Sequence, residues 1–250
     1  MKKGVLYVFF IGVIAVSGIL WYIESHKKVE LPEIFNDSPS EIVIDDSHKQ
    51  KARINGLPVN LSPDVDLNAE RAAHNNNEIL GRLEIPDLFN VLVVQGPDNS
   101  YYLKRNIDRQ PDERGSEFFD YRTGPYAKQI NIYGHNTWDE RIKVAFVKLQ
   151  NFLNKEFFDN NQYIILQTDA GRMYFRILGF KQVHNYDKTH LMVDYTGPEF
   201  AAHIYDMTNG EGTIYNRDVD YNENSQIIVL QTCSHDWANS FYILVGIRVK

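Results

Sequence analysis

From Ile79 onward the chain consists mainly of short apolar runs that are separated by turn-forming residues such as Gly96-Pro97-Asp98-Asn99 and Gly124-Pro125. Runs of this length between turn signals predict β-strands. We expect strands at residues 81–85, 91–95, 117–121, 129–133, 163–167, 173–183, 226–232 and 241–249. Many short strands with few helices favour a closed barrel or a sandwich over a parallel α/β sheet.

Three segments carry helical rather than strand patterns. They are residues 66–77, capped by Asp64 or Asp66, residues 142–154, and residues 199–207, which follow Pro198. In the second segment, apolar residues recur at the spacing of one helix face, at Ile142, Phe146, Leu149 and Leu153. The chain is therefore predicted to be mainly β with added helices.

The N-terminal residues predict a membrane anchor. Lys2 and Lys3 precede an uncharged run from Gly4 to Ile23, which as a helix would span about 30 Å, the thickness of a bilayer core. The small-x-small sequence Ala15-Val16-Ser17 lies inside this run, so a cleavage site is disfavoured. We expect residues 1–23 to be an uncleaved, single-pass transmembrane helix in the cell membrane, with the large domain outside the cytoplasm.

The rest of the chain divides into a stalk and one domain. Residues 24–77 are charged and proline-containing, and are predicted to form an extracytoplasmic stalk that ends in the short helix. Residues 78–250 are long enough for one sizeable core. The formal net charge of −7 argues against a nucleic-acid-binding protein, because such proteins usually carry a basic stripe.

Cys233 is the one cysteine of the chain, and it ends the predicted strand 226–232. A lone thiol cannot form an internal disulfide, and structural zinc sites use two to four thiolates. Reactivity usually decides whether a cysteine is retained, so we predict a nucleophile. An inert buried thiol is the alternative.

His135 is the second candidate for chemistry. It follows the predicted strand 129–133 in the turn Gly134-His135-Asn136, where a side chain can act as an acid or a base without being packed away. An imidazole near a thiol can relay its proton. An ordinary surface histidine is the alternative. The remaining histidines lack metal-ligand spacing, and we predict neither a metal nor a cofactor.

Two motifs together resemble the sortase signature: Tyr133-Gly134-His135-Asn136 and Leu230-Gln231-Thr232-Cys233. The stretches 98–103 and 119–122 and the helix after the histidine loop are similar to class B sortases, and the resemblance covers residues 78–250. It implies a closed eight-stranded β-barrel behind the transmembrane helix. It also implies a cysteine transpeptidase in which Cys233 is the nucleophile and His135 the general acid and base, with Thr232, Asn136 and Phe241 at the substrate groove.

The implied reaction cleaves an LPxTG-like or NPxTx-like sorting motif of a secreted protein through a thioacyl-enzyme. The freed carboxyl group is then joined to an amine of peptidoglycan or of a pilin. The resemblance implies no cofactor and no nucleic acid partner.

One position departs from the family pattern. Class B sortases carry an arginine eight residues after the cysteine, and this chain has Phe241 there. The resemblance implies that this arginine donates hydrogen bonds to the substrate carbonyl and to the oxyanion that develops on it. Loss of one such donor costs about 2.7–4 kcal/mol in the transition state. Arg248 is offset from this position by an odd number of residues, so it points to the opposite face of a regular strand. Arg122 is a possible substitute.

Two alternatives remain open. The first is a catalytically weakened sortase homologue that acts as a substrate-binding or pilus-assembly module, which the phenylalanine at position 241 favours. The second is another Cys-His enzyme of the cell envelope, such as an L,D-transpeptidase. Those enzymes place the two residues close together in sequence, whereas here they are 98 positions apart (233 − 135).

Overall fold

The computed structural model describes residues 42–44, 50–54, 57–137, 144–195, 197–236 and 238–249. The predicted transmembrane helix at residues 1–23 lies outside these ranges. No helix within them is sufficiently long and apolar to cross a membrane.

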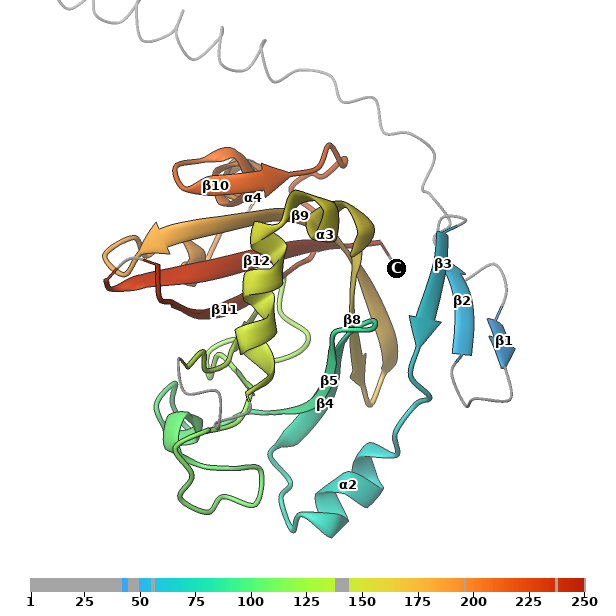
Figure 1. Ribbon diagram of the computed structural model, residues 1–250. Helices are drawn as coiled ribbons and strands as arrows, with labels where there is room; N and C mark the ends of the chain where they lie inside the picture. The colour runs from blue at the N-terminus through green and yellow to red at the C-terminus, as the bar shows by residue number, and fades with distance from the viewer. Residues whose placement is uncertain are drawn as a thin grey trace, which may run out of the picture. The chain divides into compact units, whose positions relative to one another are not determined.

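Eight strands close into a barrel in the order β9-β12-β11-β7-β6-β5-β4-β8, and β8 pairs back onto β9 (Figure 1). The predicted closed eight-stranded barrel is therefore confirmed. β7 and β11 are parallel neighbours, and β11 and β12 form an antiparallel hairpin. The barrel strands are β4 (Ile79–Ile85), β5 (Phe89–Val94), β6 (Phe118–Phe119), β7 (Gln129–Tyr133), β8 (Tyr163–Thr168), β9 (Gly171–His184), β11 (Ile227–Ser234) and β12 (Ser240–Arg248).

The helix expected at residues 142–154 is divided in the structure, and two short 3-10 helices, η1 (Tyr101–Lys104) and η3 (Thr189–Leu191), were not expected. The segment expected to be a single helix at 142–154 contains the 3-10 helix η2 (Ala145–Leu153), followed by the α-helix α3 (Lys155–Asn160). The Asn154 side chain accepts a hydrogen bond from the Phe157 amide and so starts a new helix at this point. The remaining helices are α2 (Leu67–Ala73), capped by Asp66, one of the two predicted caps, and α4 (Pro198–Asn209).

Both faces of β11 are buried, which explains why its sequence is apolar without alternation. Ile228 and Leu230 pack inside the barrel, whereas Ile227 and Val229 face outward. The outer face is covered by α4, which Figure 1 shows beside β10 (Thr213–Asn216), the strand added outside β9. By this alternation Cys233 lies on the outer face of the barrel, together with Ile227 and Val229.

The region assigned to the stalk contains structure of its own. β1 (Ile42–Ile44), β2 (Gln50–Ile54) and β3 (Leu57–Leu61) form a three-stranded sheet. Leu61 is buried against Ile165 and Tyr174 of the barrel. Residues 57–77 therefore pack with the barrel rather than extend from it. The apolar side chains of β3 are too few to form a sequence pattern, but they are enough to bury this strand.

Polar contacts hold the same segment on the barrel. The Ser62 amide and hydroxyl both donate to Glu84 at 2.8 Å, and Arg172 pairs with Asp64. The structured domain thus begins before residue 78.

Candidate active site

The parallel pairing of β7 and β11 brings the two sequence motifs together. Tyr133 is paired with Gln231, so both strands end at the same edge of the barrel. The turn that carries His135 follows β7 at this edge, and Thr232 and Cys233 occupy the end of β11. Residues that are about 100 positions apart in sequence therefore become neighbours.

Hydrogen bonds fix the two strand ends against each other. The Gly134 amide donates to the Gln231 carbonyl at 3.2 Å, and the buried Thr232 hydroxyl donates to the Gly134 carbonyl at 2.8 Å. The Asn136 amide nitrogen donates to the carbonyl of Cys233 at 2.8 Å. The side chains of Thr232 and Asn136 therefore fix the backbone beside His135 and at Cys233.

Gly134 is required by close packing in this turn. A Cβ atom at this position would lie 2.7 Å from the ring of Phe146, which belongs to the first turn of η2 and is pressed against the histidine loop. Contacts under 3.0 Å force one of the partners to move. A side chain at residue 134 would thus displace His135 from the end of β11.

The thiol of Cys233 is free and its side chain reaches the solvent. Desolvation by the surrounding protein nevertheless raises the pKa of Cys233 above its usual value. The thiol is therefore mostly protonated at neutral pH, and it needs a base before it can attack a carbonyl group.

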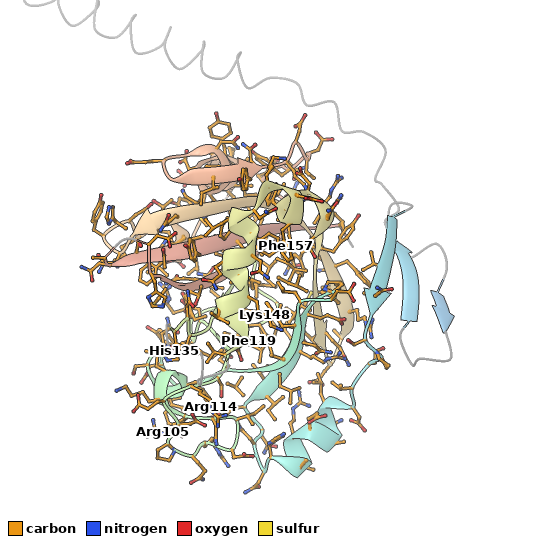
Figure 2. The ribbon with its side chains drawn as sticks, viewed as in Figure 1. Arg105, Arg114, Phe119, His135, Lys148 and Phe157 are labelled. Atoms are coloured by element: carbon orange, nitrogen blue, oxygen red, sulfur yellow. The ribbon has the colours of Figure 1, made fainter. Side chains whose placement is uncertain are left out.

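His135 is positioned by a backbone group. Its Nε2 lies 2.5 Å from the carbonyl oxygen of Leu103, which is part of η1. A carbonyl oxygen only accepts hydrogen bonds, so Nε2 carries the proton and Nδ1 of the neutral ring is the basic nitrogen. Figure 2 shows His135 on the side of the barrel that carries Arg105 and Arg114, both of which lie between Leu103 and His135 in the sequence.

The base and the nucleophile lie at adjacent strand ends but are not hydrogen-bonded to each other in this conformation. Within the described residues, no hydrogen bond joins the Cys233 thiol to the His135 ring, whose Nε2 is bound to the Leu103 carbonyl. Proton transfer between them requires movement of a side chain or a bridging group. Catalytic hydrogen bonds are often completed only when substrate binds.

Phe241 lies directly across the hairpin from Cys233. Paired residues in an antiparallel hairpin point to the same face, so the half-buried Phe241 ring lines the surface beside the thiol. Arg248 is at the other end of β12 and donates to the Gln226 side chain at 2.8 Å. The arginine of β12 is thus remote from Cys233.

Arg122 is engaged by a buried carboxylate. Its Nε and Nη2 donate to Asp120 at 2.9 and 2.7 Å, and Nη2 also donates to the Leu191 carbonyl at 2.9 Å. Desolvation acts to raise the pKa of Asp120, but hydrogen bonds from Arg122, Tyr133 and Asn99 lower it to about 2. Arg122 is therefore part of a structural ion pair beneath the histidine strand.

A buried polar network on the outer face of β7 was not predicted from the sequence. Gln129 donates to the backbone carbonyl of His190 at 2.9 Å, and Asn131 donates to the same carbonyl at 3.2 Å. The His203 ring lies 2.7 Å from the Gln129 side-chain oxygen. The signal was present in the sequence, because Gln129 and Asn131 alternate with isoleucines in a strand that is otherwise apolar. In the described part of the chain, no group of three or more metal-ligating side chains could hold a metal ion.

Known proteins resemble this chain in sequence and in fold. No protein-family model matches the chain. Sortase B of Staphylococcus aureus is 24% identical over 170 residues, which are 66% of this chain and 67% of that protein.

Two solved structures show the same fold. Sortase B of Clostridium perfringens superposes with a TM-score of 0.65 at 24% identity and covers 72% of this chain and 100% of that chain. Sortase B of B. anthracis gives a TM-score of 0.63 at 23% identity over 77% of this chain and 86% of that chain. The chain thus has the fold of the class B sortases and resembles them in sequence, as its two motifs indicate.

Proposed function

We propose that this protein is a sortase-type cysteine transpeptidase, in which Cys233 is the nucleophile and His135 the general acid and base. The proposal rests on one observation, that hydrogen bonds hold the ends of the parallel strands β7 and β11 against each other. Thr232 bonds to Gly134 and Asn136 bonds to Cys233, so a solvent-accessible thiol and an imidazole with a defined tautomer share one edge of the barrel.

The reaction has two acyl-transfer steps. His135 accepts the thiol proton, and the Cys233 thiolate attacks the carbonyl carbon at the cleavage site of a sorting motif, forming a C–S bond. The C–N bond then breaks, and His135 returns the proton to the leaving amine. An incoming amine loses a proton to His135, attacks the thioacyl carbon and releases the thiolate.

The substrate is a secreted protein with an LPxTG-like or NPxTx-like motif, and the acceptor is an amine of peptidoglycan or of a pilin. Proteins with the same fold support this proposal. Sortase B of Staphylococcus aureus has been solved with a substrate, a sortase B has been solved with triglycine, and a Streptococcus pyogenes class B sortase is involved in pilus biogenesis. With the predicted anchor at residues 1–23, the reaction takes place at the outer surface of the cell membrane.

A second candidate function is a weakened homologue that binds sorting motifs or assists pilus assembly without efficient turnover. The observation that favours it is Phe241, an apolar residue in the position directly across from Cys233. The two candidates predict different products, since only the transpeptidase forms a covalent intermediate at an appreciable rate.

The test incubates the purified full-length chain with a panel of fluorogenic sorting peptides, with and without an amine such as triglycine. Mass spectrometry of the protein should show an acyl adduct on Cys233, and the peptide should become joined to the amine. The Cys233→Ala variant is the matched control and should show neither. Peptide binding without any adduct in the parent supports the weakened homologue, whereas an adduct on the Ala variant removes Cys233 from the mechanism.

A further inference from the structure

The turn η3 is attached to the outer face of β7 by its backbone. The His190 carbonyl accepts from Gln129 at 2.9 Å and from Asn131 at 3.2 Å, and the next carbonyl, that of Leu191, accepts from Arg122 at 2.9 Å. All three donors are held by strand β7 or by the buried Asp120 ion pair. The position of His190 is therefore set by the same strand that carries His135.

The side chain of His190 lies over the end of the β11–β12 hairpin. Its ring is only 2% exposed and meets the Phe241 ring edge-on, with the two centroids 6.0 Å apart. Phe241 is the residue paired with Cys233, and the His190 ring also faces Gln231, which lies on the same face two residues before the cysteine. The imidazole thus covers the turn end of the β11–β12 hairpin, on the face to which the thiol points.

The ring nitrogens of His190 have no partner at hydrogen-bonding geometry among the described residues, although both are buried. A buried polar group without a partner costs about 1–3 kcal/mol of stability, so such a group requires an explanation. The Gln231 side chain is near enough to act on the pKa of His190 as a hydrogen-bond partner would, but its oxygen does not reach full bonding geometry. A donor without a partner can serve a ligand that binds beside the thiol, and since neither ring nitrogen is exposed in this conformation, the ligand reaches it when the covering Phe241 or Gln231 side chain moves.

The imidazole is neutral under working conditions. Desolvation is the main cause that lowers the pKa of His190 to about 4, and Lys188 and Lys181 act in the same direction, against Asp187 and Gln231. At neutral pH the ring therefore carries one N–H and no charge. Neutral imidazoles with a lowered pKa polarise substrate carbonyl groups in other enzymes.

We propose that His190 donates its ring N–H to the carbonyl oxygen of the acyl group on Cys233, and so supplies the donor that Phe241 cannot provide. This inference rests on the transpeptidase function proposed above. When the thiolate attacks, the carbonyl oxygen gains negative charge and the N–H bond to it strengthens. His190 keeps its proton throughout, because His135 carries out both proton transfers.

Two substitutions separate donation from packing. His190→Phe keeps a ring against Phe241 but has no N–H, whereas His190→Gln keeps an N–H donor and loses the ring. Removal of one oxyanion donor lowers kcat by about 10²–10³-fold. We expect that loss in the Phe variant with little change in KM, and a smaller loss in the Gln variant. A Phe variant more active than the Gln variant would mean that His190 only packs, and would overturn the inference.

Further measurements distinguish this inference from the proposed function. The rate of acyl-adduct formation on Cys233 is followed by mass spectrometry, and the unfolding midpoint confirms that each variant is folded. If the parent forms the adduct and the Phe variant forms it equally fast, the inference fails and the transpeptidase stands. If the folded parent forms no adduct with any peptide, both fail.

A second-site substitution provides a positive test. Phe241→Arg introduces a donor across from Cys233, so it should restore kcat in the His190→Phe background by about tenfold or more, which corresponds to about 1.4 kcal/mol. No recovery in that double variant, together with a gain in the parent chain from Phe241→Arg alone, would show that the two positions serve different steps and would contradict the assignment.

Discussion

Replacement of Asp120 by Asn should destabilise the barrel beneath the histidine strand. The side chain of Asp120 has no exposed surface, and it accepts hydrogen bonds from Arg122 at 2.7 Å, Tyr133 at 2.7 Å and Asn99 at 3.1 Å. Asparagine has nearly the same size but no charge, so it leaves the Arg122 guanidinium without its ionic partner.

The size of the effect follows from the titration of the carboxylate. Desolvation opposes ionisation of Asp120, but its hydrogen bonds outweigh this and lower its pKa from 3.8 to about 2. A lowering of this size, at 1.36 kcal/mol for each pKa unit, corresponds to about 2–3 kcal/mol in favour of the folded state. Because this pKa is depressed on folding, the contribution is complete above about pH 4 and is lost as the pH falls towards 2.

Thermal unfolding followed by circular dichroism measures this difference. At pH 7 the Asp120→Asn variant should unfold about 5–10 °C below the parent, since 1 kcal/mol shifts the midpoint of a domain of this size by about 2–4 °C. Near pH 2.5 the gap should narrow. Asp159→Asn is the matched control, because it removes an exposed pair with Lys155 and should change stability by at most about 0.5 kcal/mol. Equal midpoints for the Asp120 variant and the parent at pH 7 would refute the reasoning.

Three other outcomes are expected. His135→Ala should lower kcat by about 10²-fold while the unfolding midpoint stays near that of the parent, and undiminished turnover would identify a different base. A chain that begins at residue 57 should unfold at a higher temperature than one that begins at residue 78, because only the longer one retains the buried contacts of Leu61, and equal midpoints would contradict this. Alkylation of Cys233 by iodoacetamide in the His135→Ala variant should be slow at pH 7 and rise only at alkaline pH, because desolvation raises the pKa of the thiol, whereas fast labelling at pH 7 would mean that the thiol is already ionised.

Much of the candidate site could be predicted from local sequence patterns. Short apolar runs between turn residues indicated nearly all barrel strands, because burial on both faces leaves an apolar run that can be recognised by itself. The histidine turn and the cysteine strand end carried their motifs in contiguous residues. Counting eight residues from Cys233 singled out Phe241, whereas its place directly across from the thiol comes from the register of the hairpin.

Other features had no local signal. The short strand β3 buries its few apolar residues only because the barrel provides a partner surface, so the sequence indicated a stalk. The break between η2 and α3 depends on a cap at Asn154, which competes with an unbroken apolar periodicity.

The sequence by itself determined the chemical groups, Cys233 and His135, and the strands that end beside them. Tertiary structure decided what surrounds these groups. The parallel pairing of β7 with β11 joined the two motifs, and the long connection from β9 to α4 placed His190 against Phe241. Neighbours of this kind are set by strand order and by the return path of a loop, and their hydrogen bonds form between residues far apart in the chain. No local pattern encodes such contacts, because each one depends on how the whole barrel closes.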